Sequence, residues 1–296
     1  MRKSFATSIV KLGKDPNCIF ITGDLGFMAL ENVKESFGTR FINAGVAEQN
    51  MIGVAAGLAK DGFKVFVYSI APFCYARPFE QIRNDICLAK LPVCLVGNGG
   101  GYAYGYMGPT HHALEDCAAM NALGVKVLVP SFDEDIPSML NTINAATYLR
   151  LGYDVRPKNS KISLWEPWRK VLEGSVGVLV ALGPLAGNAM HAFVDVPPSQ
   201  RPSVWAVTDL SESEVPQLFW DQAEGKDIYV IEEHVQSGGL GSIIALLAAR
   251  LGITFSNFYH RFALRYPSGR YGSQEFHRIE CGLDINGIKN LVFGKA

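Results

Sequence analysis

Short apolar runs alternate with longer segments of helical periodicity along the first half of the chain. Such runs are typical of buried strands, and the longer segments between them are typical of crossover helices. The predicted strands are Cys18–Thr22, Lys64–Ser69, Pro92–Gly97 and Lys126–Pro130. The predicted helices are Val46–Lys60, Arg77–Lys90, His112–Leu123 and Asp133–Leu149. This alternation predicts an α/β fold built on a parallel sheet.

A polar, proline-containing stretch, Tyr153–Lys161, interrupts the alternation before a second strand and helix series begins. The second series comprises predicted strands at Val176–Leu182, Val204–Thr208, Asp227–Glu232 and Thr254–Tyr259, and a predicted helix at Gly239–Leu251. We therefore expect two α/β domains: a first domain over residues 1–155, a linker over 156–172, and a smaller domain over 173–296.

Composition and charge narrow the class of protein. With 296 residues, 48% of them hydrophobic, the chain has enough apolar material for two cores. A net charge of −1 without a dense Lys/Arg cluster argues against nucleic acid as a partner. No apolar run approaches the roughly 20 residues that span a bilayer, and Met1–Asn17 lacks the apolar core of a secretion signal. We expect no membrane partner and a cytoplasmic location, with the six cysteines as buried thiols.

A lone acid, Glu48, opens a predicted helix that is otherwise made of small and apolar residues. A carboxylate at this position favours the positive end of the helix dipole, an effect worth about 0.3–1 kcal/mol, and this structural explanation competes with a chemical one. Gly53 and Gly57 in the same helix permit the close approach of a ligand or of another backbone.

The glycine-rich stretch Gly97–Gly108 follows a predicted strand but does not fit a dinucleotide-binding pattern. No register gives Gly-x-Gly-x-x-Gly, since a tyrosine occupies the third glycine position. His111 and His112 follow on the same loop, where an imidazole can transfer protons near neutral pH. For His112 we favour a packing or capping role. In the second domain, Ile231–Ser242 carries paired acids and a glycine-rich turn, which we interpret as a tight strand-to-helix turn packed on a neighbouring subunit more readily than as an anion site.

Five segments, in order, resemble the transketolase family. They are Ile21–Leu25 (ITGDL), Phe41–Gly53 (FINAGVAEQNMIG), Ala71–Ile86 (APFCYARPFEQIRNDI), Gly108–Asp116 (GPTHHALED) and Val230–Ser242. The resemblance covers the pyrimidine-binding and C-terminal domains of that family. The Gly-Asp-Gly motif, with which the family holds diphosphate and metal, is not found. The resemblance therefore implies one subunit of a split transketolase.

The resemblance assigns roles to several residues. Glu48 would be the catalytic acid that hydrogen-bonds the aminopyrimidine of thiamine diphosphate and helps to remove the thiazolium C2 proton. Phe73 would stack on the aminopyrimidine, and Asp24 would approach the thiazolium side of the cofactor. Arg77 joins the expected cofactor-binding residues, although an ion pair on its helix is an alternative for it. His111 would contact substrate oxygens and is the second expected catalytic residue.

The sequence departs from the family at three expected substrate-binding positions. Gly99 stands where relatives carry a histidine, Met107 where they carry an aspartate, and Tyr153 where many carry an arginine that binds a substrate phosphate. These changes put a ketose phosphate donor in doubt. Tyr102, Tyr104 and Tyr106, in the altered loop, offer aromatic faces and hydroxyls to a sugar or a nucleotide-linked group, with packing beside the missing partner as the alternative.

From the resemblance we expect thiamine diphosphate as cofactor, with Mg²⁺ held mainly by a separate N-terminal diphosphate-binding subunit and no metal ligand on this chain. The expected assembly is an α2β2 heterotetramer. The expected activity is transfer of a two-carbon ketol or acyl unit to a carbonyl acceptor, including an unusual sugar. A 2-oxo acid donor with decarboxylation is one alternative, and a non-catalytic scaffold or regulatory subunit is an alternative of another class.

Overall fold

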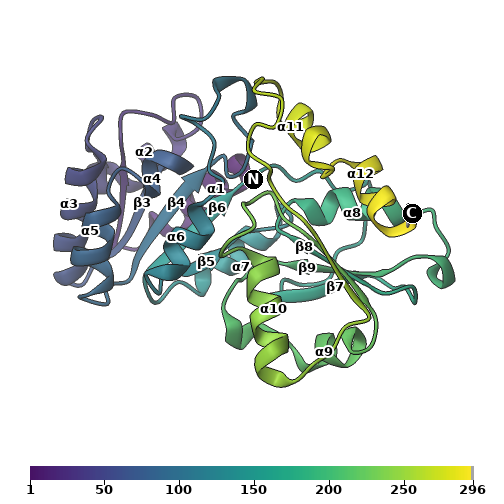
Figure 1. The fold of residues 1–296 in the computed structure, drawn as a ribbon. Coiled ribbons are helices and arrows are strands. Elements are labelled where there is room, and N and C mark those ends of the chain that lie inside the picture. Colours follow the sequence, from purple (N-terminus) through teal and green to yellow (C-terminus); the bar gives the residue numbers. More distant parts are fainter. Residues whose placement is uncertain (295–296) are drawn as a thin grey trace.

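The first of two sheets in the computed structural model, which describes residues 1–294, is six-stranded and parallel (Figure 1). Its strand order is β2-β1-β3-β4-β6-β5. The strands are β1 (Cys18–Thr22), β2 (Phe41–Asn43), β3 (Lys64–Ile70), β4 (Val93–Asn98), β5 (Lys126–Leu128) and β6 (Thr147–Leu151). Most of their residues are buried on both faces, which explains why they appear as continuous apolar runs. The predicted α/β fold with a parallel first sheet is confirmed.

Helices cover both faces of this sheet (Figure 1). They are α1 (Arg2–Leu12), α2 (Glu31–Phe37), α3 (Glu48–Lys60), α4 (Ala71–Tyr75), α5 (Phe79–Gln81), α6 (Asp116–Ala122) and α7 (Asp135–Asn141). Helix α3 buries Met51, Ile52 and Ala55 against the sheet, while Gly53 and Gly57 lie on its exposed face. The predicted helix Arg77–Lys90 begins only after Pro78, as α5 followed by a short π-helix at Ile82–Cys87.

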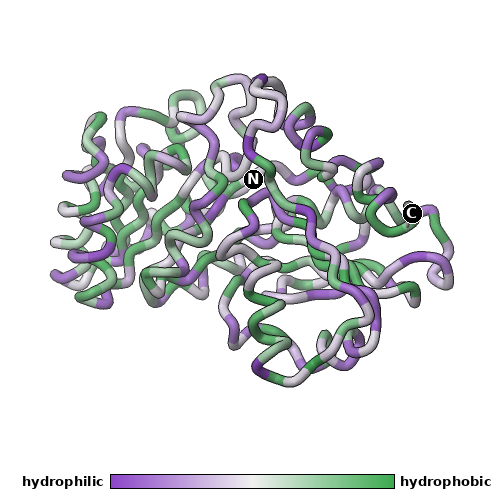
Figure 2. The backbone as a smooth tube through the Cα atoms, viewed as in Figure 1, coloured by the Kyte–Doolittle hydropathy of each residue, from purple (hydrophilic) through white to green (hydrophobic). Residues whose placement is uncertain are grey.

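The second sheet has five strands in the order β11-β10-β8-β9-β7. Its strands are β7 (Trp168–Leu172), β8 (Val178–Leu182), β9 (Ser203–Val207), β10 (Asp227–Ile231) and β11 (Asn257–Arg261). Its helices are α8 (Leu185–Phe193), α9 (Gln217–Ala223), α10 (Leu240–Leu251), α11 (Gln274–Cys281) and α12 (Ile285–Phe293). Most positions of α10 are apolar (Figure 2). Strand β7 runs antiparallel to β9, whereas the other pairings are parallel.

One predicted element is wrong in part. The segment Asp133–Leu149 is not a single helix, because α7 ends at Asn141 and Thr147–Leu151 forms strand β6. All five residues of β6 are buried between β4 and β5, and a fully buried strand shows no alternation that distinguishes it from a buried helix.

The last five residues of the expected linker, Trp168–Leu172, form β7 and therefore belong to the second sheet. A short edge strand with three partly exposed residues gives little apolar signal. The borders proposed for the two domains stay a prediction. The first domain contains the six-stranded sheet, and the second domain contains the five-stranded sheet.

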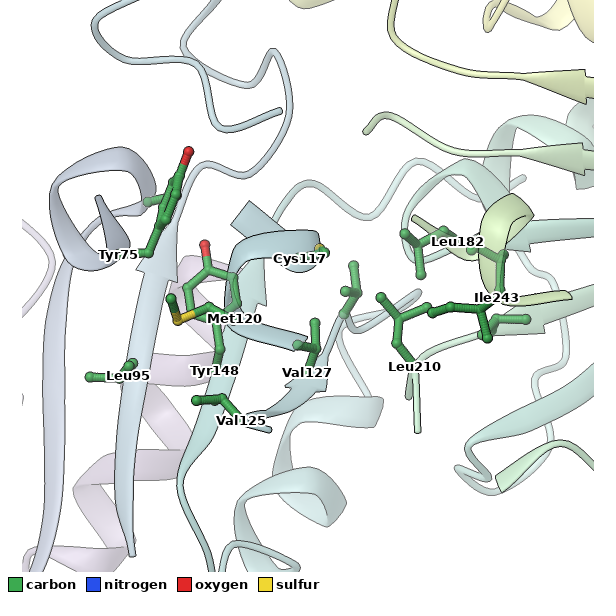
Figure 3. Close-up of a cluster of buried hydrophobic side chains, with 14 of the residues drawn as sticks. Tyr75, Leu95, Cys117, Met120, Val125, Val127, Tyr148, Leu182, Leu210 and Ile243 are labelled. Carbon is green, nitrogen blue, oxygen red and sulfur yellow. The ribbon is translucent and has the colours of Figure 1, made fainter. Parts of the chain in front are cut away.

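A continuous apolar cluster joins the two domains (Figure 3). Leu95 and Tyr148 contribute to it from the first sheet, and Leu182 and Ile243 from the second domain. The free cysteines are buried, except for the partly buried Cys87. Within residues 1–294 no helix is long and apolar enough to cross a membrane. The shared core packs the second domain against the side of the first sheet that ends in strand β5.

Candidate active site

The carboxyl ends of the parallel strands gather most of the predicted site residues at one edge of the first sheet. Asp24 follows β1, Glu48 begins α3 after β2, and Phe73 lies in α4 directly after β3. Gly99 follows β4, and Tyr153 follows β6. In parallel α/β sheets, ligands bind outside this edge. The topology alone therefore makes it the candidate site.

Glu48 is a buried carboxylate at the start of a helix. Its side chain is 7% exposed, and the unpaired N–H groups of the first turn of α3 favour its negative charge. Glu48 Oε1 accepts a hydrogen bond from Arg77 Nη1 at 2.6 Å. This ion pair occupies one of the two carboxylate oxygens and leaves Oε2 for a ligand.

Arg77 and His111 both contact Phe73, so four of the predicted site residues form one group. The Arg77 guanidinium lies over the Phe73 ring, 3.8 Å from its centroid, in cation–π geometry. The His111 ring meets the Phe73 ring edge to face, with centroids 5.1 Å apart. Arg77 is 45% exposed and is thus free to yield the Phe73 face to a planar ligand.

Tyr104 is a further aromatic residue of the candidate site and lies next to His111. The two rings are 6.1 Å apart, and Asn98 Nδ2 donates to the Tyr104 hydroxyl at 2.7 Å. Burial raises the pKa of Tyr104, against the opposing effect of the Asn98 hydrogen bond. Tyr104 is therefore a neutral, oriented phenol at neutral pH.

The two adjacent histidines have different surroundings. His111 is partly exposed, and its Nδ1 lies 2.9 Å from Thr110 Oγ1, so the imidazole can reach a ligand. His112 is buried, with Nδ1 2.8 Å from the Tyr266 hydroxyl and Nε2 3.0 Å from the Gly105 carbonyl oxygen. Burial lowers the pKa of His112, which fits the packing role favoured for it.

Asp24 forms a separate pair with Asn43 at the end of β2. Asn43 Nδ2 donates to Asp24 Oδ1 at 3.2 Å, and the Asp24 backbone N–H donates to Asn43 Oδ1 at 2.9 Å. Asp24 also lines a pocket beside the exposed side chain of Phe27. Among the described residues, no hydrogen bond, ion pair or ring contact joins this pair to Glu48, Phe73, Arg77 or His111.

The remaining predicted substrate residues divide into two kinds. Met107 and Tyr153 are 56% and 53% exposed and are accessible to a ligand. Tyr102 is 0% exposed, with its ring stacked on His277 at 4.6 Å and its hydroxyl donating to the Arg265 carbonyl oxygen. In this structure Tyr102 packs against the second domain and does not line the site.

The structure adds two residues to the site that the sequence did not single out. They are Asn98, which donates to the Tyr104 hydroxyl, and Asn43, which pairs with Asp24. Asn98 and Asn43 are polar residues at the last positions of two strands, a signal that the sequence did contain. The pairing of Tyr104 with Asn98 depends on how the loop folds back, which local sequence does not specify.

The site residues fit the aminopyrimidine half of thiamine diphosphate. An open pocket at the start of α3 is lined by Val46, Ala47, Glu48, Gln49, Asn50 and Arg77. A buried carboxylate with one oxygen available suits a ring nitrogen, and the adjacent Phe73 suits a planar ring.

A magnesium ion does not fit the one cluster of potential ligands among residues 1–294, Asp116, Cys117 and His234. Arg150 Nε lies 2.7 Å from Asp116 Oδ2, so a cation already neutralises the carboxylate. Burial raises the pKa of the Cys117 thiol well above its usual value, and a neutral thiol is a poor ligand for a hard cation.

The glycine-rich turn of the second domain is occupied by the protein itself. The two Glu232 carboxylate oxygens accept hydrogen bonds from the backbone N–H groups of Leu240 and Gly241, at the start of α10. His260 Nε2 lies 2.7 Å from the same carboxylate. The turn is therefore a strand-to-helix connection whose N–H groups at Leu240 and Gly241 are taken by an internal carboxylate.

Gly99 and Tyr104 depend on each other, and this gives a first prediction. Gly99 has φ +79°, and a Cβ at this position would lie 2.2 Å from the Tyr104 ring. We expect Gly99→Ala to lower the free energy of unfolding by about 1–3 kcal/mol, because alanine is strained at positive φ and displaces Tyr104. Urea unfolding of the chain measures this.

Gly57→Ala is the matched control, since Gly57 lies in a helix with no atom within 4 Å of an added Cβ. It should stabilise the chain by roughly 0.5–1 kcal/mol. In a Tyr104→Ala background, Gly99→Ala should cost less than in the wild type. An equal cost in both backgrounds would show that the tyrosine does not restrict this position.

Comparison with known proteins gives consistent matches. A family model described as the transketolase pyrimidine-binding domain matches residues 1–150. A putative transketolase C-terminal section from Methanocaldococcus jannaschii is 31% identical over 304 residues, covering 99% of this chain and 95% of that protein. One subunit of an apulose-4-phosphate transketolase from Phocaeicola vulgatus is 28% identical over 254 residues, with 82% of this chain and 81% of that protein covered.

The fold also matches a solved structure. A protein described as a split gene transketolase, inactive beta4 tetramer, superimposes with a TM-score of 0.79 at 26% identity, and the match covers 98% of this chain and 96% of that one. The similarity therefore extends over both sheets and includes the loops that carry the candidate site.

Proposed function

Because the chain belongs to the transketolase family, we propose that it is the pyrimidine-binding subunit of a two-chain enzyme that transfers a two-carbon ketol or acyl unit to a carbonyl acceptor. The buried carboxylate of Glu48, beside the Phe73 ring at the sheet edge, is the observation that carries this proposal. The nearly full-length similarity to a transketolase C-terminal section supports it.

Thiamine diphosphate, when bound, supplies an acidic ring carbon that becomes the nucleophile. In the proposal, Glu48 Oε2 would hydrogen-bond the aminopyrimidine ring nitrogen, while Arg77 Nη1 holds Oε1. Phe73 would support the plane of the ring, on the face that the Arg77 guanidinium covers in the free chain. Asp24, paired with Asn43, would approach the thiazolium side of the cofactor, as the resemblance implies.

The substrate side of the proposed site comprises His111, Gly99, Met107, Tyr153 and Tyr104. His111 donates to or accepts from substrate oxygens near neutral pH. Gly99, Met107 and Tyr153 provide no charge for a phosphate. Two relatives are named for a phosphorylated sugar, apulose-4-phosphate. Donors with and without a phosphate group should therefore both be assayed.

The proposed partner is an N-terminal diphosphate-binding transketolase subunit, which also holds most of the Mg²⁺ ligands, in an α2β2 assembly. The exposed face next to Glu48 suits a protein neighbour. Val46 is 76% exposed, and Gly53 and Gly57 have no atom within 4 Å of an added Cβ. The absence of side chains at Gly53 and Gly57 allows a second chain to approach this part of α3 closely.

The experiment is reconstitution with a candidate N-terminal subunit, thiamine diphosphate and Mg²⁺, followed by assay of a donor panel. The panel contains a ketose phosphate, an unphosphorylated ketose and a 2-oxo acid. Aldose formation without carbon dioxide would support ketol transfer, and carbon dioxide release would support the 2-oxo acid alternative. Absence of turnover with every donor, in a pair that co-purifies, would contradict the proposal and favour a scaffold.

A further inference from the structure

Glu233, a residue of the second domain, directly contacts the loop that carries the substrate side of the candidate site. This loop, residues 99–112, is called the site loop. Glu233 is 5% exposed and lies just after β10. Its Oε1 accepts the backbone N–H of Tyr102 at 2.6 Å and the side chain of Gln274 at 2.8 Å, while Oε2 pairs with Arg278. A charged acceptor makes these hydrogen bonds strong.

The backbone of the site loop is shaped to accept this carboxylate. Gly101 has φ +64°, and a Cβ at this position would lie 2.2 Å from Glu233 Oε1. A Cβ at Gly105 would lie 2.4 Å from the Gly272 carbonyl oxygen. Two glycines of one loop are therefore required by its contact with the second domain.

Side chains on both sides of the exposed part of the site loop are also held by the second domain. Tyr102 stacks on His277 and donates to the Arg265 carbonyl oxygen at 2.8 Å. His112 meets the Tyr266 hydroxyl at 2.8 Å. Between these two anchors lie Tyr104 and His111, the residues that reach the candidate site.

We infer that Glu233 is a positioning residue: through the Tyr102 N–H it fixes the site loop so that Tyr104 and His111 face the substrate. Its role in turnover rests on the proposed function, whereas its hold on the loop does not. The second domain thereby contributes to substrate binding without touching the substrate.

The first test is hydrogen exchange on the full chain without partner or cofactor. In Glu233→Ala, the amides of residues 100–111 should exchange about tenfold to a hundredfold faster than in the wild type, since a hydrogen bond to a charged group is lost. Glu233→Gln should give a smaller increase, because its amide oxygen still accepts the Tyr102 N–H.

Asp135→Ala is the matched control, since it breaks a different buried ion pair, which joins α7 of the first domain to β7 of the second sheet. Asp135 and Arg169 are both almost completely buried, and neither contacts the site loop among the described residues. Asp135→Ala should leave exchange in residues 100–111 unchanged. Equal acceleration by both variants would overturn the inference, because it would reflect general loss of stability.

Kinetics of the reconstituted enzyme provide the second readout. We expect Glu233→Ala to raise KM for the donor about tenfold or more, with the Kd of thiamine diphosphate changed less than about twofold. If Glu233→Ala does not fold, Glu233→Ala/Arg278→Ala removes both charges and is measured instead. An inactive wild-type pair would count against the proposed function, and the exchange data would still decide the inference about Glu233. In an active pair, an unchanged KM for Glu233→Ala would overturn that inference.

Discussion

Replacement of Glu48 by glutamine is expected to lower kcat of the reconstituted enzyme by about a hundredfold to ten-thousandfold, the range that positioned acid–base groups contribute. Glutamine preserves the shape of the buried side chain and still hydrogen-bonds a ring nitrogen, but it has no exchangeable carboxyl proton. Because Glu48 also pairs with the partly exposed Arg77, the variant should lose little stability. Initial rates at saturating donor, together with thermal unfolding, measure both effects.

The matched control is Glu80→Gln, which neutralises an exposed acid close in sequence to Arg77. It should change kcat less than about twofold, since an exposed charge makes little difference to a reacting group. Equal, near-wild-type rates for both variants would mean that Glu48 only stabilises the start of its helix through the helix dipole. A scaffold role for the chain would then be the better explanation.

The second large effect is expected from Asp116→Ala, on stability. Asp116 is 0% exposed, and its Oδ2 accepts from Arg150 Nε and from the Tyr148 hydroxyl, both at 2.7 Å. Without Asp116, the buried Arg150 guanidinium keeps its charge without a carboxylate partner. Breaking a buried pair in this way costs about 3–5 kcal/mol, a large part of the total of about 5–15 kcal/mol for a typical protein. Urea unfolding followed by fluorescence measures the loss.

Two further variants separate the buried charge from the loss of packing. Asp116→Asn/Arg150→Met, which removes both charges, should be more stable than Asp116→Ala. Arg250→Ala breaks the exposed pair with Glu212 and should cost less than about 1 kcal/mol. If Arg250→Ala cost as much as Asp116→Ala, burial would not be the source of the effect.

Four strands of the first sheet, β1, β3, β4 and β5, were predicted because they are short, apolar and bounded by turn residues. The three-residue strand β2 was not predicted, and Thr147–Leu151, which forms β6, was assigned to a helix because it continues the apolar character of the preceding segment. Strand β7 was also missed; it is an edge strand whose partner β9 lies more than thirty positions further along the chain. Local periodicity carries no information about such distant pairing.

The candidate site shows the same division. Glu48, Phe73, Arg77 and His111 come from segments with recognisable patterns, and the structure brings them into one group. Tyr102 was predicted to bind substrate, yet its side chain is buried against a segment more than 160 residues away. The residues next to Tyr102 in sequence contain no information about this distant contact, so the burial of its side chain could not be predicted from them.

In the proposed function, this chain contributes one half of a cofactor site that a second chain completes. Calorimetric titration of thiamine diphosphate and Mg²⁺, first into the chain alone and then into its mixture with a candidate N-terminal subunit, tests this division of the site. We expect tight binding in the mixture only, with weaker binding when Glu48→Gln replaces the wild type. Equally tight binding to the chain alone would contradict it.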